Sequence, residues 1–252
     1  RKFLSKHLGI SLLLYFRSFD LPLYMVKTQG NPARVLIIND DAFELATMSA
    51  SLRLHSTNIV GEATNMLIAE NLFRSLQPEV VLIDLQFSGE EAIGLLQRFR
   101  KMDPKLGIVI TTSCPDLRLF GLLERNIPKG SRIILKRSVS DLSIITFALA
   151  ECLGSAQDGS AMKWISLHST IHANSFLTIL NEFTDIQIET LRLVAQGLSN
   201  SEIARVRFVS EKSVEQIVAR IAQHLSISPD RSKNLRVILT GEYFKWLGAP
   251  RH

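Results

Sequence analysis

Short runs of apolar residues alternate with amphipathic stretches between residues 34 and 152. The apolar runs have the length of strands, and the stretches between them repeat apolar positions at helical spacing. Five strands are predicted, at 34–38, 58–63, 79–84, 107–112 and 132–136. A predicted helix follows each strand, at 42–54, 65–76, 90–102, 116–125 and 140–152. Because runs such as VVLI and IIL are apolar throughout, the strands are expected to be parallel and buried on both faces.

Five such units in sequence match an α/β doubly wound domain of the flavodoxin-like type, with strand order 2-1-3-4-5. From residue 183 the pattern is purely helical, with helix-start signals at Thr184, Ser199 and Ser210, and it predicts four short helices. We therefore expect an α/β domain over 31–152, a linker over 153–182 that begins with GSAQDGS and has a weak helical pattern, and an all-α domain over 183–252.

The first 30 residues form a separate N-terminal extension in this division. The apolar run LGISLLLYF follows Arg1, Lys2 and Lys6, but it has about half the ~20 residues that a membrane-spanning helix needs. It resembles the start of a signal peptide without a small-residue cleavage site. We favour Met25 as the true start, with a genuine extension or packing helix as the alternative, and we expect no membrane association.

Composition narrows the class of protein. The 252 residues are 46% hydrophobic and 21% charged, as in ordinary globular domains. Residues 31–152 carry 13 basic and 14 acidic residues, whereas 153–252 carry 11 and 9, a weak indication of contact with phosphates. Cys114 and Cys152 suggest neither a disulfide framework nor zinc, so a cytoplasmic location is expected. His168 and His172 have no evident metal-binding partners and are expected on a surface helix.

Three carboxylates are expected to meet at the carboxyl edge of the sheet. Asp40 and Asp41 follow the first strand, Asp84 ends the third, and these two strands are neighbours in the predicted order. Like charges at one place need a shared cation, and oxygen ligands favour Mg²⁺. The sequence therefore predicts a magnesium site there.

The motifs IINDD, DLQFSGEEAIGLL and GIVITTS, together with Lys136, resemble those of the receiver domains of two-component response regulators, whose fold is CheY-like. The resemblance implies that Asp84 accepts a phosphoryl group from a sensor histidine kinase and that Asp40, Asp41 and Asp84 hold Mg²⁺. It also implies that the Thr112 hydroxyl and the Lys136 ammonium bind the phosphoryl oxygens. Thr111 and Ser113 are rivals of Thr112 for that role.

Several positions depart from the receiver pattern. Ile133 stands where the family usually has a Tyr or Phe that rotates inward on activation. Ser88 replaces a common Pro, Ala92 a common Gly, and Arg137 a common Pro. Gln86 and Cys114 occupy variable positions beside the pocket. These changes point to an atypical switch and leave the charged residues of the pocket complete.

The segment FTDIQIETLRLVAQGLSNSEIARVRFVSEKSVEQIVARIAQHLSI resembles the LuxR-type (NarL/FixJ-like) helix-turn-helix domain, most specifically in GLSNSEIA. Gly197 is expected to end one helix in a left-handed turn, and Ser199 with Glu202 to form a capping box for the next. Ser210 should cap the recognition helix, whose Val214, Val218, Ile221 and Leu225 recur at core spacing. A helix of this kind enters the DNA major groove by its N-terminal part.

The outward positions of these helices are the candidate contacts to double-stranded DNA, with Gln216 and Glu215 suited to read bases and the others placed near phosphates: Ser201, Lys212, Ser213, Glu215, Gln216, Ala219 and Arg220. Glu215 and Ala219 stand where the family often has Lys or Arg, and Ile217 where it often has His or Tyr. Arg207 replaces a Leu that normally packs, and Ile186 replaces a common Arg.

The last stretch, RSKNLRVILTGEYFKWLG, carries Leu235, Ile238 and Leu239 and resembles the final helix through which such domains pair, which implies a homodimer on DNA. The sequence thus predicts a transcription factor controlled by phosphorylation of Asp84. One alternative is a regulator that does not depend on phosphate. Another is a protein-interaction module with a vestigial helix-turn-helix. Since no cofactor fingerprint follows any strand, no enzymatic activity besides self-phosphorylation is expected.

Overall fold

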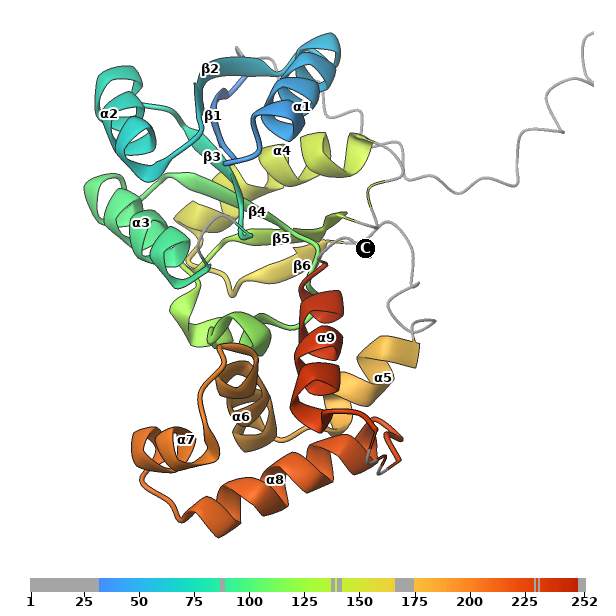
Figure 1. Ribbon diagram of the computed structural model, residues 1–252. Coiled ribbons are helices and arrows are strands. Elements are labelled where there is room, and N and C mark those ends of the chain that lie inside the picture. Colours follow the sequence, from blue (N-terminus) through green and yellow to red (C-terminus); the bar gives the residue numbers. More distant parts are fainter. Residues whose placement is uncertain are drawn as a thin grey trace, which may run out of the picture. The chain divides into compact units, whose positions relative to one another are not determined.

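The computed structural model describes residues 32–86, 89–136, 139, 142–165, 175–228, 230 and 232–248, with only the backbone given for 175–178. Its centre is a parallel sheet of six strands in the order β2-β1-β3-β4-β5-β6 (Figure 1). The strands are β1 (Arg34–Ile38), β2 (Asn58–Ala63), β3 (Val80–Asp84), β4 (Gly107–Thr112), β5 (Arg132–Leu135) and β6 (Lys163–Ile165). The α/β doubly wound fold with the core order 2-1-3-4-5 is therefore confirmed, and the sheet has one strand more than predicted.

Helices cover both faces of this sheet. The helices α1 (Ala42–Leu54) and α4 (Ser143–Gln157) lie on one face, and α2 (Met66–Leu76) and α3 (Gly89–Met102) lie on the other (Figure 1). Alternate residues of each strand supply the two cores: Val35, Leu82 and Ile134 pack with α1 and α4, whereas Leu36, Ile83 and Ile133 pack with α2 and α3. Every central strand is thus apolar on both sides, which is the reason its sequence shows no polar alternation.

The predicted helix at 116–125 is replaced by two short 3₁₀ turns, η1 (Leu117–Phe120) and η2 (Glu124–Asn126). Gly121 has a φ of +76° and ends η1, so the helical pattern of apolar residues is not followed by a helical backbone. A side chain at Gly121 would meet the Glu90 carboxylate, since a Cβ there would lie 2.6 Å from Oε1. The prediction of a fourth long helix at this place was wrong.

Regular structure also occurs within the range predicted as a linker. Helix α4 continues to Gln157, and β6 then pairs in parallel with β5, with Lys163 opposite Arg132 and Ile165 opposite Ile134. A short helix, α5 (Ser175–Glu182), lies in the later part of this range, where the weak helical pattern stands.

The remaining helices are α6 (Asp185–Ala195), α7 (Asn200–Arg207), α8 (Glu211–His224) and α9 (Leu235–Leu247). The side chains of Thr184, Ser199 and Ser210 accept hydrogen bonds from backbone N–H groups and cap α6, α7 and α8. These three predicted starts are confirmed, as is the left-handed turn at Gly197, where φ is +86°. The capping box at Ser199 is only half formed, because the Glu202 carboxylate pairs with Arg205 instead.

Some predictions fall outside the described residues: those on 1–30, Ser88, Arg137, His168 and His172. Within the described ranges, no helix has both the length and the apolar character needed to cross a bilayer.

Candidate functional site: an aspartate pocket and a helix-turn-helix face

Asp84 and Lys136 lie together at the carboxyl edge of the sheet. Asp84 is the last residue of β3 and is 4% exposed, and Lys136 follows β5 directly. Lys136 Nζ donates a hydrogen bond to Asp84 Oδ2 across 2.7 Å. Among the described residues, the second carboxylate oxygen, Oδ1, accepts a single long bond of 3.5 Å, from the Gln86 backbone N–H. The two predicted residues therefore form a buried ion pair through Oδ2 of Asp84.

For both Asp84 and Lys136, burial and ion pairing shift the pKa in opposite directions. Burial raises the pKa of the Asp84 carboxyl above its ordinary value, and Lys136 opposes the shift. Burial works against the charge of Lys136, but its hydrogen bonds to Asp84 and Glu44 outweigh burial and raise the pKa of the ammonium group. The pocket thus holds a fixed positive charge beside a carboxylate that water solvates poorly.

Glu44, on the first turn of α1, is the residue that the sequence reasoning missed. Its Oε1 lies 2.7 Å from Lys136 Nζ, so the lysine pairs with two carboxylates. The only signal in the sequence is its place three residues after Asp41. Since 92 positions separate Glu44 from Lys136, nothing local indicates that they meet.

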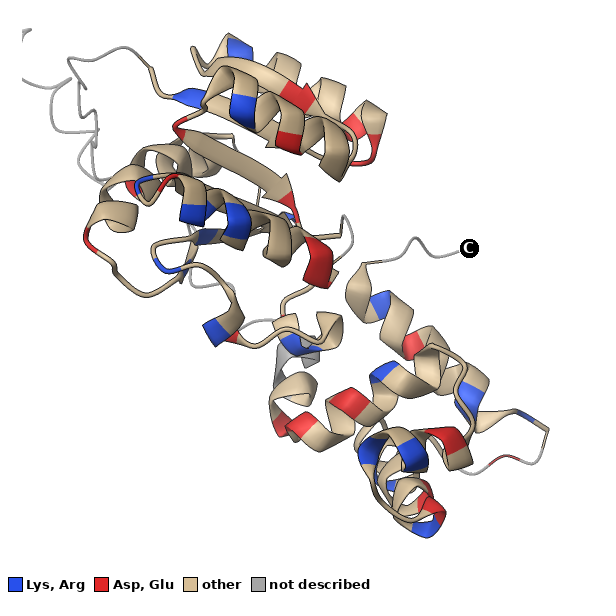
Figure 2. Ribbon diagram, turned by 90° about the vertical axis from the view of Figure 1, so that its left-hand side faces the viewer, with Lys and Arg blue, Asp and Glu red and all other residues tan. Residues whose placement is uncertain are grey.

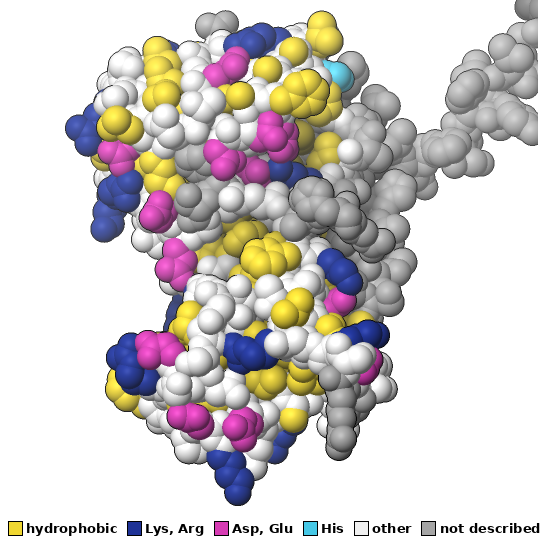
Figure 3. All heavy atoms as spheres, in the orientation of Figure 1, with side chains coloured by type: hydrophobic (Ala, Val, Ile, Leu, Met, Phe, Trp, Pro, Cys, Tyr) yellow, Lys and Arg dark blue, Asp and Glu magenta, His cyan; other side chains and the backbone are white. Residues whose placement is uncertain are grey.

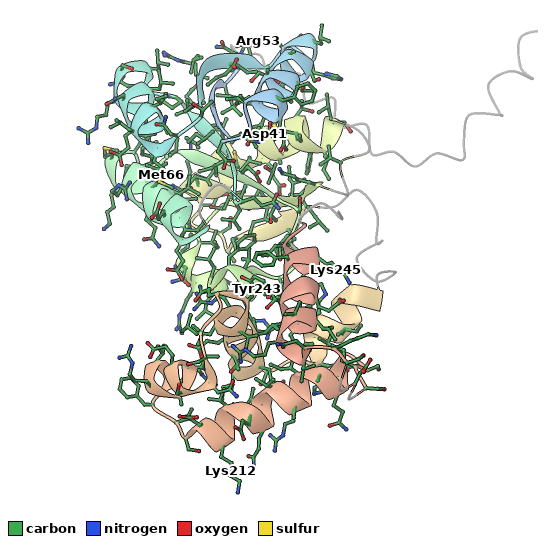
Figure 4. All side chains as sticks on the ribbon, viewed as in Figure 1. Asp41, Arg53, Met66, Lys212, Tyr243 and Lys245 are labelled. Atoms are coloured by element: carbon green, nitrogen blue, oxygen red, sulfur yellow. The ribbon has the colours of Figure 1, made fainter. Side chains whose placement is uncertain are left out.

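The acidic residues after β1 are not grouped as predicted. Asp41 is exposed and caps α1, its Oδ1 accepting from the backbone N–H groups of Phe43 and Glu44 at 2.9 Å each (Figure 4). Asp40 is exposed as well. Asn39 is buried, its Oδ1 accepts from Asp41 N, and its Nδ2 has no hydrogen-bond partner among the described residues.

These placements bear on the predicted magnesium site. No group of three or more Asp, Glu, His or Cys side chains in the described part of the chain is arranged to hold a metal ion. The cap of α1 uses Oδ1 of Asp41, and Lys136 binds Oδ2 of Asp84, so neither contact takes both oxygens of a carboxylate. The magnesium site of Asp40, Asp41 and Asp84 stays a prediction.

The three candidate hydroxyl groups after β4 all have partners of their own. Thr112 is buried, and its Oγ1 accepts from Cys114 N at 3.0 Å. Thr111 Oγ1 donates to the Ile83 carbonyl at 3.5 Å, and Ser113 Oγ donates to Gln86 Oε1 at 3.0 Å. None of the three is hydrogen-bonded to Asp84, so the role given to Thr112 stays a prediction.

Three of the positions noted beside the receiver pattern, Ile133, Ala92 and Cys114, are buried. Ile133 and Ala92 are fully buried in the core that packs with α2 and α3. Cys114 is buried too, and its thiol donates to the Asp116 carbonyl at 3.3 Å. Ile133 has no polar group and cannot report a change at the pocket by a hydrogen bond.

The segment after β4 contacts the C-terminal helices directly. Arg118 of η1 pairs with Asp116 and Asp185 and donates to the carbonyls of Leu180 and Phe183. Tyr243 of α9 donates its hydroxyl proton to the Leu119 carbonyl at 2.7 Å (Figure 4). The place of the predicted helix at 116–125 is thus taken by short turns that bind α6 and α9.

The helix-turn-helix consists of α7, the turn at Phe208 and α8. Val214, Val218 and Ile221 are buried as predicted, while Leu225 is only partly buried. Six of the predicted DNA contacts are exposed and Ser213 is partly exposed, and Lys212 projects away from the domain (Figure 4). The face is free in the described structure, and its role in DNA contact stays a prediction.

Charges on these helices are mixed. Lys and Arg lie among Asp and Glu over α6 to α9 (Figure 2), and the space-filling view shows no uniform basic patch on the face it presents (Figure 3). Arg207, which stands where a packing Leu is usual, is 9% exposed; its Nη1 donates to Thr190 Oγ1 at 2.7 Å and its Nε to Glu189 Oε2 at 3.2 Å. This departure is compatible with the fold because the guanidinium donates two hydrogen bonds to α6.

Comparisons with known proteins cover both the α/β region and the helix-turn-helix region. Residues 181–231 match the family model described as bacterial regulatory proteins, luxR family. The chain contains a luxR-family helix-turn-helix domain and is homologous to bacterial response regulators, which confirms the resemblance found in the sequence.

Two relatives make the homology concrete. The transcriptional regulatory protein LiaR of Bacillus subtilis is 26% identical over 203 residues, which cover 79% of this chain and 93% of LiaR. The response regulator protein VraR of Staphylococcus saprophyticus is 24% identical over 204 residues, covering 80% of this chain and 94% of VraR. A solved structure of the two-component response regulator RcsB with DNA is 21% identical, has a TM-score of 0.49, and covers 86% of this chain and 100% of that one.

Proposed function

We propose that this protein is a DNA-binding transcription regulator whose state is set by transfer of a phosphoryl group to Asp84. The observation that carries the proposal is the buried Asp84–Lys136 pair, present in the same chain as a luxR-family domain with an exposed recognition helix. A sensor histidine kinase is the proposed donor. The other proposed partners are double-stranded DNA and a second copy of this chain.

The proposed reaction is a single displacement at phosphorus. The carboxylate oxygen Oδ1 of Asp84 forms the new P–O bond, while the P–N bond to the phosphohistidine breaks and its electron pair returns to the ring nitrogen. Lys136 holds a positive charge against the carboxylate and would pair with the phosphoryl oxygens as a point charge. Thr112 is the proposed hydroxyl donor to those oxygens.

Magnesium stays a proposal drawn from the chemistry of such pockets. Asp40, Asp41 and Asp84 are the side chains proposed to hold it, and when bound it would neutralise charge on the phosphoryl oxygens. Asp41 caps α1 through Oδ1, and its Oδ2 is the atom proposed to bind the metal.

Incubation with acetyl phosphate and Mg²⁺, followed by intact-mass measurement, tests the phosphorylation. We expect one added phosphoryl group on the wild-type chain and none on Asp84→Asn, and a loss of the reaction when the metal is chelated. A wild-type chain without mass gain would contradict the proposal and leave the phosphate-independent regulator, which the fully buried Ile133 favours.

Selection of genomic DNA fragments, with and without the phosphodonor, tests the output. We expect enriched sequences that are lost on Gln216→Ala, since Gln216 is exposed on α8 and an amide can bond adenine bidentately. Enrichment that is absent for the wild-type chain would instead favour the protein-interaction module.

The homodimer is proposed through α9, on a face that differs from the predicted one. Leu239 is buried in the core of its own domain, whereas Val237 and Phe244, seven positions apart on one face of the helix, are 68% and 45% exposed. Val237 and Phe244 are therefore the residues proposed to pair.

A further inference from the structure

Lys136 is paired with two carboxylates in the described structure. Its ammonium donates hydrogen bonds to Asp84 and Glu44, and three carboxylate oxygens lie within 3 Å of Nζ. Nζ is 2.7 Å from Asp84 Oδ2, 2.7 Å from Glu44 Oε1 and 2.9 Å from Glu44 Oε2. Glu44 thus takes two of the three contacts of the cation that is expected to receive the phosphoryl group.

The position of Glu44 is fixed by the start of α1. Asp41 caps the helix and accepts a hydrogen bond from the Glu44 backbone N–H at 2.9 Å. The Glu44 side chain is 35% exposed and Lys136 is 21% exposed, so their contact is only partly screened by water. The acidic run after β1 therefore positions a competing carboxylate at the pocket.

Phosphorylation increases the negative charge at Asp84 that Lys136 neutralises. The paired Asp84 carboxylate carries one negative charge, whereas a phosphoryl group carries about −1.5 to −2 near neutral pH. Glu44 would then be a like charge beside that group, and it would still occupy the ammonium protons that the phosphoryl oxygens need. Both effects act against the phosphorylated state.

We propose that Glu44 is a positioning residue that competes with the phosphoryl group for Lys136 and so lowers the occupancy of the phosphorylated state. The inference rests on the proposed phosphorylation of Asp84. In the unphosphorylated state, Lys136 pairs with both Glu44 and Asp84, which form a Glu44–Lys136–Asp84 triad rather than a single ion pair. Release of Lys136 from Glu44 accompanies stable phosphorylation.

The test uses the full chain with beryllium fluoride, a stable phosphoryl mimic, and with acetyl phosphate, both in one magnesium buffer. Glu44→Gln removes the charge and keeps the shape of the side chain, and Glu44→Ala removes both. We expect about a tenfold lower midpoint for beryllium fluoride and a higher phosphorylated fraction, the equivalent of one charge-assisted hydrogen bond regained by the ligand.

Glu70→Gln is the matched control. Glu70 is 30% exposed and pairs with Arg98 between α2 and α3, so its loss also removes one partly exposed ion pair but not one at the pocket. Its midpoint should equal that of the wild-type chain. Unfolding curves of the ligand-free variants show whether each is folded before titration.

A double-mutant cycle separates competition from a merely structural role. In a Lys136→Gln background the effect of Glu44→Gln should disappear, because the competition needs the lysine. A midpoint within twofold of wild type for Glu44→Gln, a weaker midpoint, or an unchanged effect without Lys136 would overturn the inference while a reactive wild-type chain keeps the proposed function. If neither wild type nor Glu44→Gln reacts, both proposals fail. If Glu44→Gln alone reacts, the proposed phosphorylation of the wild-type chain fails while competition by Glu44 is supported.

Discussion

The side-chain amide of Gln86 donates a hydrogen bond to the carbonyl oxygen of Leu247, with 2.6 Å between Nε2 and O. Gln86 stands two positions after Asp84, and Leu247 is the last residue of α9. The same Gln86 side chain accepts from Ser113 after β4. Gly248, with φ at +85°, follows Leu247 and fits against Ser113, since a Cβ there would lie 2.5 Å from the serine Cβ. The C-terminal end of α9 thus contacts Gln86 and Ser113, which follow β3 and β4 beside Asp84.

Loss of this amide should loosen the end of α9. In Gln86→Ala the Leu247 carbonyl loses its side-chain donor, and we expect faster amide hydrogen exchange over residues 243–248, measured by mass spectrometry. Gln97→Ala is the control, because the Gln97 amide donates to the Asn126 carbonyl at 2.8 Å, away from α9. Equal exchange in the two variants would show that the contact does not hold the helix end.

Arg207 should stabilise the C-terminal domain by joining α7 to α6. Arg207→Ala removes the bonds to Thr190 and Glu189 together with a nearly buried side chain, and we expect a loss of about 2 kcal/mol in the free energy of unfolding. Arg207→Leu should cost less than about 1 kcal/mol, since an apolar side chain can replace a buried ionic one. Urea unfolding measures both.

The control for Arg207 is Arg205→Ala. Arg205 is 73% exposed and pairs with Glu202 within α7, so this change should leave the free energy of unfolding close to that of the wild-type chain. A loss at Arg207 no larger than that at Arg205 would contradict the role assigned to it.

Cys152 should be inert to alkylation in the folded protein. Burial raises the pKa of its thiol to about 12, so the thiol stays protonated at pH 8 and up to about pH 10, where an ordinary cysteine is largely thiolate. We expect no addition of iodoacetamide at Cys152 across this range, and full labelling in urea. Mass mapping of the peptides provides the measurement.

The same pKa shift of Cys152 determines how the free energy of unfolding depends on pH. The unfolded chain loses the Cys152 proton near pH 8.5 and the folded chain only near pH 12, so the folded state binds more protons between these values. This group therefore makes the free energy of unfolding decrease as the pH rises above about 8.5. Cys152→Ser removes this ionisation. A gain in the free energy of unfolding over the wild-type chain that occurs only at high pH would agree with this sign.

Salt dependence should report the phosphate contacts proposed for α8. Each of Lys212→Ala and Arg220→Ala should reduce the slope of log affinity against log salt concentration by about 0.9, because one released counterion is lost. Lys245→Ala is the control, since Lys245 lies on α9 and pairs with Glu242. Unchanged slopes for Lys212 and Arg220 would remove them from the DNA face.

The sequence predicted most of the α/β domain because its strands are continuous apolar runs. Burial on both faces of the sheet leaves a pattern in RVLII, VVLID and GIVITT that needs no tertiary information. The meeting of Asp84 with Lys136 was implied by the resemblance to receiver domains, and the strand order allows it, since β3, β4 and β5 are neighbours. The helix caps at Thr184 and Ser210 could likewise be predicted from residue type and spacing.

The features that were missed depend on contacts between distant residues. The stretch at 116–125 keeps apolar residues at helical spacing, but Gly121 takes a left-handed conformation and the segment packs on α6 and α9 instead. Glu44 is one acidic residue among several until the fold brings the Lys136 ammonium within 2.7 Å of its carboxylate. The cap that Asp41 forms on α1 was missed as well, because residue type alone does not show which carboxylate caps a helix.

The three-residue strand β6 changes where the sheet ends. Without it, β5 would present its free N–H and C=O groups on an edge of sequence RIIL, which is a template for pairing with other chains. A receiver fragment that stops at residue 152, where the five-unit pattern ends, would leave this edge uncovered and prone to self-association. Fragments meant to isolate the receiver should therefore continue through Ile165.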